Sequence, residues 1–139
     1  MNESLEKIKQ FFAADRFAME NGIEIVAAEP GYACCRCAIL PHHLNAGNAG
    51  QGGMLFTLGD FTFAVAANAT GRLTVSLDNT ISFQKPAKGK ILFAKAQELS
   101  AGKTVCQYQV QITDELETKI ASMLVTGFCK GENHILDNA

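Results

Sequence analysis

The stretch His42–Gly71, HHLNAGNAGQGGMLFTLGDFTFAVAANATG, decides the fold predicted for this chain. It starts as a glycine-rich loop and continues into the long apolar segment Met54–Ala69, for which we expect a central helix. Asp60 is the one charged residue of that segment. A carboxylate buried on such a helix loses its hydration, which costs several kcal/mol unless partners compensate for it. Asp60 is therefore either a buried group satisfied by backbone donors or a lysine, or a functional residue.

Segments that alternate apolar and polar residues lie on both sides of this helix. Gly22–Ala28 and Tyr32–Leu40 flank the turn signal Pro30-Gly31, which predicts a hairpin. Four more strands are expected after the helix, at residues 73–83, 91–99, 104–113 and 119–129.

The first strand after the helix contains one polar residue that breaks its pattern. The residues predicted to share its apolar face are Val75, Leu77, Ile81 and Phe83. Asn79 is the only polar side chain that the alternation places on the same face.

Both ends of the chain are expected to lie outside the central helix and the sheet. Residues 1–20 predict an amphipathic N-terminal helix, because apolar side chains recur at helical spacing from Ser4 to Glu20 and Asn21-Gly22 follows as a stop signal. Residues 131–139 are mostly polar and predict a flexible tail. The order of elements indicates a single α+β domain over residues 1–139, with a helix against one face of an antiparallel sheet.

Composition argues against several classes of protein. The 139 residues are 47% apolar and 19% charged with a net charge of −2, so no basic surface is available for nucleic acid. No window reaches about 18 uninterrupted apolar residues and the N-terminus lacks the features of a signal peptide, which predicts a cytoplasmic protein without a membrane span. The five cysteines lack zinc-site spacing. We expect them to be reduced core thiols, and we expect no metal or cofactor.

The start of the central helix is the predicted chemical site. Gly52 and Gly53 stand where the helix should begin, and the first N–H groups of a helix have no partner within it. They are therefore candidate donors to a carbonyl oxygen that becomes negative during acyl transfer. Asp60 lies eight residues after Gly52, about 12 Å along a helix axis. Because one helix cannot bring both groups to one carbonyl, a two-fold dimer is the simplest arrangement that can.

Other polar residues of the loop are weaker candidates. Asn45 and Gln51 either orient a water or a thioester carbonyl, or only bond within the loop. His42 and His43 stand beside the loop, where a histidine is more often a surface or hydrogen-bonding group than a base.

A small basic group follows the first strand after the helix. It consists of Lys85, Lys88 and Lys90 around Pro86. These lysines are either solvated turn residues or a site for an anionic, phosphate-bearing ligand.

The spacing of these residues resembles the signature of the PaaI-type hotdog-fold acyl-CoA thioesterases. The matching residues are His43-Leu44-Asn45, Gln51-Gly52-Gly53 and Asp60, followed by Ile81-x-Phe83-x-x-Pro86-Ala87-x-x-Gly89 and Gly102-Lys103. The resemblance implies a long helix wrapped by a curved antiparallel sheet, a homodimer with a continuous sheet, and often a homotetramer. It also implies hydrolysis of an acyl-CoA or acyl-carrier thioester, with coenzyme A as part of the substrate.

The resemblance also implies roles for individual residues. In this family the acid that matches Asp60 is a nucleophile or a general base that acts across the dimer interface, and the glycine that matches Gly52 polarises the thioester carbonyl. Asn45 matches the polar loop residue that positions the substrate or the water, and Gln51 completes the expected catalytic set. The residues expected to bind substrate are Gly53, His43, Lys85 and Lys88.

Two positions depart from the family pattern. Gln51 stands where the family usually has histidine, and Ala64 where it often has serine or threonine. These departures lead to an alternative hypothesis, a hotdog module that binds acyl-CoA without turning it over. A hotdog dehydratase is a third hypothesis, but it pairs a histidine with an acid, and His42 and His43 lie outside the expected position.

Overall fold

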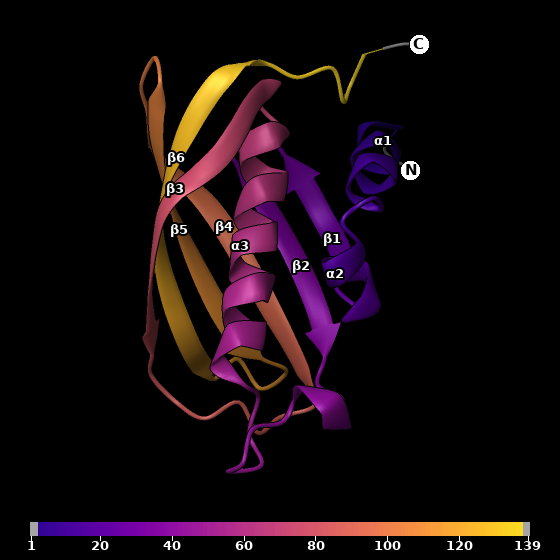
Figure 1. The fold of residues 1–139 in the computed structure, drawn as a ribbon, viewed down its shortest axis with the longest axis vertical. Helices are drawn as coiled ribbons and strands as arrows, with labels where there is room; N and C mark the ends of the chain where they lie inside the picture. The colour runs from indigo at the N-terminus through magenta and orange to yellow at the C-terminus, as the bar shows by residue number, and fades with distance from the viewer. Residues whose placement is uncertain (1–2, 138–139) are drawn as a thin grey trace.

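The computed structural model describes residues 3–137, which form one six-stranded antiparallel sheet curved around a long helix (Figure 1). The helix is α3 (Gly52–Asn68). In spatial order the strands are β1 (Glu24–Glu29), β2 (Tyr32–Ala38), β4 (Ile91–Ala101), β5 (Val105–Asp114), β6 (Lys119–Glu132) and β3 (Arg72–Phe83). The predicted α+β hotdog architecture is confirmed. No helix of the part that is described is long and apolar enough to cross a membrane.

The sequence of α3 suits a helix that is covered on most sides. Its inward residues pack on the sheet, and Leu58 and Val65 have no measurable exposure. Gly59 allows the helix to approach β6 closely, because a Cβ at this position would overlap the sulfur of Met123. The five cysteines are free and buried, as expected for small core side chains.

The N-terminal segment forms two helices and not the single one predicted. They are α1 (Glu3–Phe12) and α2 (Arg16–Glu20). Asp15 causes the break: its backbone is extended, and its side chain accepts a hydrogen bond from the N–H of Ala18 as the N-cap of α2. Phe12 at the end of α1 packs edge-on against Phe61 of α3, with ring centroids 5.5 Å apart.

Strand β3 lies at the edge of the sheet and contains a bulge. Its pairing with β6 shifts register between Ser76 and Asp78. Because of this extra residue, the alternation of inward and outward side chains before the bulge is reversed after it. Val75 and Leu77 are 43% and 62% exposed, whereas Asn79 is partly buried and faces α3. The prediction that Val75 and Leu77 share a face with the apolar residues after Asn79 is therefore wrong, because a bulge changes the parity of the pattern.

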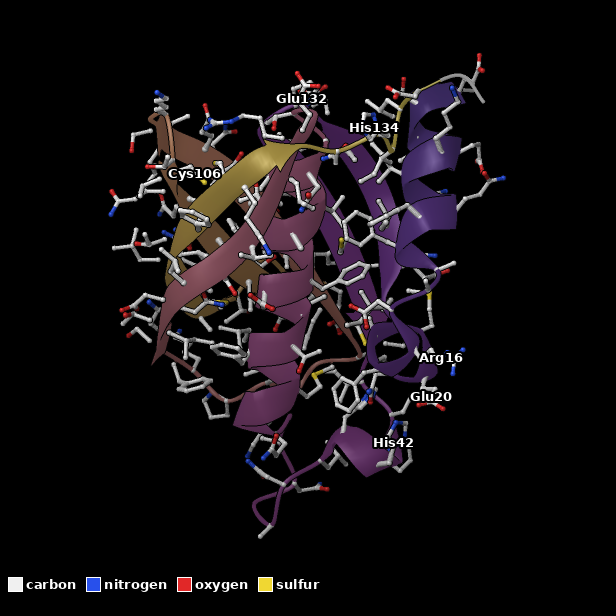
Figure 2. The ribbon with its side chains drawn as sticks, turned by 45° about the horizontal axis from the view of Figure 1, so that its top comes forward. Arg16, Glu20, His42, Cys106, Glu132 and His134 are labelled. Carbon is white, nitrogen blue, oxygen red and sulfur yellow. The ribbon has the colours of Figure 1, made fainter. Side chains whose placement is uncertain are left out.

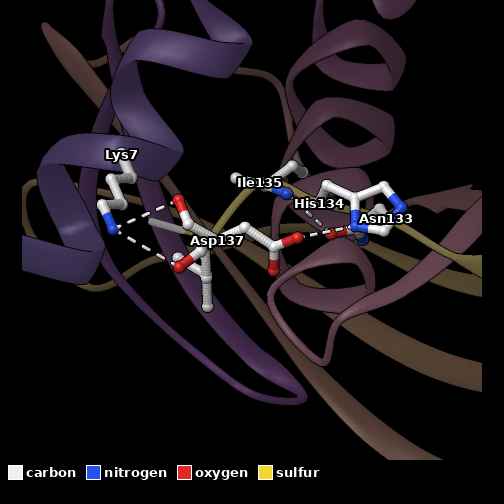
Figure 3. Close-up of polar contacts among 6 residues, drawn as sticks. Lys7, Asn133, His134, Ile135 and Asp137 are labelled. Atoms are coloured by element: carbon white, nitrogen blue, oxygen red, sulfur yellow. Dashed lines mark hydrogen bonds and ion pairs between the residues drawn. The ribbon is translucent and has the colours of Figure 1, made fainter. Parts of the chain in front are cut away.

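The C-terminal residues, for which we expected a flexible tail, contact the rest of the domain up to residue 137. Asn133 Nδ2 donates to the carbonyl oxygen of Asn68 at the end of α3 (2.9 Å), and Ile135 packs on the core. Lys7 Nζ on α1 donates to the backbone carbonyl oxygens of Leu136 and Asp137, both at 3.4 Å (Figure 3). These contacts connect α1 to the end of α3.

Candidate active site

The first turn of α3 carries two free backbone donors. Gln51 is the N-cap: its Oε1 accepts from Met54 N–H (3.2 Å), and its carbonyl oxygen accepts from Met54 (2.9 Å) and Leu55 (3.2 Å). The N–H groups of Gly52 and Gly53 donate no hydrogen bond anywhere in the described chain. Two adjacent unpaired donors at the positive end of a helix form a site for a carbonyl oxygen that becomes negative. The predicted helix start is confirmed.

Asn45 shapes the loop that leads to this turn. Its Oδ1 accepts from the N–H groups of Gly47 (2.9 Å) and Ala49 (3.1 Å). The N–H of Gly50 donates to the carbonyl oxygen of Ala87 (2.8 Å), and a Cβ on Gly50 would lie only 2.9 Å from that of Ala87. Glycine is thus required for this close approach of two loops. The Nδ2 of Asn45 has no acceptor among residues 3–137, so it can still donate to a ligand.

Two hollows flank the helix N-terminus. The first, which we name the Lys85 groove, has a volume of about 440 Å³. It is lined by Asn45, Gly50, Gly52, Phe83, Lys85 and Pro86, among others. The second, the His43 pocket, has a volume of about 430 Å³. Its lining includes Phe17, His43, Leu44, Gln51, Gly53 and Met54. The helix start therefore presents Gly52 to one hollow and Gly53 to the other.

The lysines of the basic group around Pro86 differ in their position relative to the Lys85 groove. Lys85 lines the groove, whereas Lys88 is exposed and is not among its lining residues. The backbone N–H of Lys90 is held by the carboxylate of Glu115 at 3.0 Å. Of the three lysines, only Lys85 lines the same hollow as Gly52.

His43 is buried, and both of its ring nitrogens are engaged. Nδ1 lies 3.0 Å from the backbone N of Leu40, which can only donate, so Nδ1 accepts and Nε2 carries the proton toward Asn21 Oδ1 (3.2 Å). Burial, assisted by the neighbouring His42, holds the pKa of His43 below its ordinary value. His43 thus connects the short helix η1 (Pro41–His43) to the end of α2, and in this conformation it has no spare ring nitrogen for a substrate.

In Figure 2, His42 on η1 is drawn at the same end of the molecule as the α2 residues Arg16 and Glu20, and His42 lines the His43 pocket together with Phe17 of α2. A thiol also lies in this region: Cys37 Sγ donates to the carbonyl oxygen of Asn21 (3.1 Å). Burial raises the pKa of Cys37 to about 11, so it is a protonated thiol at neutral pH and not a nucleophile.

Asp60 lies on the side of α3 that faces β3. It is partly buried, and its Oδ1 accepts a hydrogen bond of 2.6 Å from Asn79 Nδ2. As its spacing predicts, it lies about two helical turns, roughly 12 Å, from Gly52 on the same helix. A single protomer does not bring the carboxylate to the Gly52 donor. Asn79 is the polar neighbour that sequence analysis did not place in the site, although it was the one polar residue that the predicted alternation put among apolar ones.

Comparison with known proteins identifies the family. The model of the "Thioesterase superfamily" matches residues 51–121, a segment that includes Gln51, Gly52 and Asp60. The chain belongs to this superfamily. It is 32% identical over 108 residues to acyl-coenzyme A thioesterase PaaI of Escherichia coli, an alignment that covers 77% of each chain.

Solved thioesterase structures agree with this assignment. The structure of Escherichia coli PaaI, from the phenylacetic acid degradation operon, superposes with a TM-score of 0.88 at 27% identity and covers 94% of this chain and 95% of that one. A hypothetical thioesterase from Streptococcus pneumoniae, solved with coenzyme A, has a TM-score of 0.82 at 25% identity, with 88% and 98% covered. The chain is a PaaI-type hotdog thioesterase, and the predicted enzyme class is confirmed.

Proposed function

We propose that this thioesterase hydrolyses acyl-CoA thioesters at a site built from two protomers. The observation that carries the proposal is the pair of free N–H groups of Gly52 and Gly53 at the start of α3. Gly52 lines one of the two hollows and Gly53 the other, and the helix that they begin also carries Asp60. Relatives that act on or contain coenzyme A support the choice of thiol.

In the proposed reaction, the thioester carbonyl oxygen accepts a hydrogen bond from the N–H of Gly52, and Asn45 Nδ2 donates to the substrate. Asp60 of the partner subunit acts on the carbonyl carbon, either by removing a proton from a water that attacks it or by attacking it directly. The C–S bond breaks, the thiolate of coenzyme A leaves and takes up a proton, and the acid is released; in the direct route water then hydrolyses the anhydride. Gln51 supports the donors by capping the helix.

The Lys85 groove is the proposed entrance for coenzyme A. It joins the exposed Lys85 side chain to the Gly52 donor within one hollow of about 440 Å³. An ammonium group at this position attracts phosphate groups, and the groove leads from it toward the thioester. We assign the coenzyme A arm to this hollow and the acyl group to the opposite side of the thioester carbon.

The edge strand β3 supports a homodimer. It has no neighbour on its outer side within residues 3–137, and Leu73 and Leu77 on it are 37% and 62% exposed. Pairing of β3 with the same strand of a second copy would continue the sheet and cover this edge. On the outer face, Val75, Phe128 and Val105 are neighbours across three strands and are each more than a third exposed. This apolar row supports association of two dimers into a homotetramer.

The test is release of free thiol from a panel of acyl-CoAs. We expect turnover by the wild type and a loss of at least about 100-fold in Asp60→Asn. Glu132→Gln, which removes a carboxylate charge at the far end of β6 (Figure 2), is the control and should keep full activity. Equal rates for Asp60→Asn and the wild type would exclude Asp60 from the reaction. Tight binding of CoA esters without turnover of any panel member would favour the binding-module alternative.

The interface itself can be tested by mixing subunits. Asp60→Asn and a variant that lacks the Gly52 N–H should each be inactive alone, but a mixed dimer contains one site with both groups intact. Recovery of up to half of the activity per mixed dimer is expected. No recovery in verified mixed dimers would place both groups of a site in the same protomer.

A hotdog dehydratase gains no support from the geometry. That chemistry requires a free imidazole next to an acid, and His43 uses both ring nitrogens within the protein. Asp60 is paired with an amide instead.

A further inference from the structure

Asn79 makes the one side-chain contact recorded for the Asp60 carboxylate in the described chain. Its Nδ2 donates to Asp60 Oδ1 at 2.6 Å, a short bond of the kind seen when the acceptor is charged. Asn79 therefore engages Oδ1 as a donor, and Oδ2 has no hydrogen-bond partner among residues 3–137.

The backbone of β3 is arranged to present this amide to the helix. Asn79 follows the bulge between Ser76 and Asp78, which changes the parity of the strand and turns Asn79 toward α3. Its backbone pairs with Val125 on β6, so the position of the amide is set by the sheet. The carboxylate is thus connected to the edge strand that forms the proposed dimer interface.

The amide of Asn79 destabilises the folded state. Asn79 Oδ1 is buried and has no hydrogen-bond partner, and it is the single buried side-chain atom of which this is true among residues 3–137. An unpaired buried acceptor destabilises the folded state, and a leucine of similar size would remove that penalty. A purely structural residue at this position would not need to be an asparagine.

We propose that Asn79 is a positioning residue for the thioesterase reaction. Its Nδ2 donates a hydrogen bond to Asp60 Oδ1 and thereby fixes the plane of the carboxylate. Oδ2 then stays directed toward the water or the thioester carbon in the site shared with the partner subunit. This inference rests on the proposed function of Asp60. It adds that β3 sets the orientation of the carboxylate. The same strand forms the proposed dimer interface and so sets the relative position of the two protomers.

The first experiment compares Asn79→Leu with the wild type in steady-state thiol release. Loss of the amide frees the carboxylate to rotate, and misplacement of a reacting group by about 1 Å costs on the order of 100-fold in rate. We therefore expect kcat to fall about 100-fold. KM should stay within about twofold, because Asn79 contacts Asp60 and not the substrate. Thr80→Val, on the neighbouring residue whose side chain is exposed, is the control and should leave kcat unchanged.

The second experiment combines Asn79→Leu with Asp60→Asn. If Asn79 acts through Asp60, the double variant is no slower than Asp60→Asn alone. Losses that multiply would overturn the inference, as would an unchanged kcat in Asn79→Leu. An active Asp60→Asn enzyme would instead refute the proposed function itself. Failure of the proposed function can therefore be distinguished from failure of the inference about Asn79.

Folding and assembly are checked by the melting temperature and by light scattering of the dimer. If Asn79→Leu does not fold, Asn79→Ala supplies the same test, because it removes the amide without adding bulk. The carboxylate is again free to rotate, so Asn79→Ala should also lose about 100-fold in kcat. Wild-type kcat in a folded, dimeric Asn79→Ala would refute the inference.

Discussion

Replacing Gly52 by proline removes one N–H from the candidate oxyanion hole while leaving the helix intact. Gly52 is the first residue of α3, where proline is well tolerated because the N–H has no acceptor within the helix. Its φ is not in the left-handed region. Gln51 before it has φ −67° and ψ 138°, the extended geometry that a residue preceding proline adopts. The substitution therefore deletes a donor without breaking a hydrogen bond of the protein.

The added side chain requires a matched control. A Cβ on Gly52 would lie 3.1 Å from Cζ of Phe83, so the ring must move by a few tenths of an ångström. Phe83 is 54% exposed and has room to do so. Gly52→Ala adds the same Cβ and keeps the N–H. The difference between Gly52→Pro and Gly52→Ala therefore isolates the donor.

Removal of one oxyanion donor lowers kcat by about 10²–10³-fold, or roughly 2.7–4 kcal/mol of transition-state stabilisation. We expect a difference of this size between Gly52→Pro and Gly52→Ala when thiol release is measured at saturating acyl-CoA. Their melting temperatures should agree within a few degrees. If a folded Gly52→Pro turns over as fast as Gly52→Ala, the Gly52 N–H does not stabilise the transition state and the reasoning from the helix N-terminus is refuted.

Two further predictions concern the flanking hollows. Lys85→Ala should raise KM for acyl-CoA about two- to fivefold, an effect that added salt weakens, while Lys88→Ala outside the groove should not; equal effects would remove the groove from substrate binding. The lowered pKa of His43 predicts that acid destabilises the folded state. Because burial lowers its pKa, the unfolded chain takes up the proton first, and the free energy of unfolding falls as pH drops below about 6.5 until the folded pKa is reached. Urea titrations between pH 5 and 8 should show a shallower fall in His43→Gln; parallel curves would contradict this.

Much of the fold was predictable because the chain repeats local signals. Alternating strands, the turn at Pro30-Gly31 and the apolar run after Gly53 gave six strands and a central helix close to their observed bounds. The errors arose where one residue changed the pattern. Asp15 capped a second short helix within a continuous amphipathic stripe, and the bulge after Ser76 reversed the faces of β3.

The candidate site was predictable in part. The helix start at Gly52 and the isolated carboxylate of Asp60 follow from residue types and spacing alone. Partners distant in sequence do not, because hydrogen bonds over such separations depend on how the sheet folds over the helix. Asn79 stands 19 residues from the acid it contacts, and His43 stands 22 residues from Asn21.

The sequence by itself determined that a glycine-started apolar helix would carry one carboxylate about two turns from its free N–H groups, since helical rise and the unpaired first turn are local properties. Only the tertiary structure decided what surrounds those groups. It placed Asn79 against Asp60, engaged both nitrogens of His43, and opened one hollow beside Gly52 and another beside Gly53. Those contacts come from segments that the folded sheet brings together, and no local pattern specifies them.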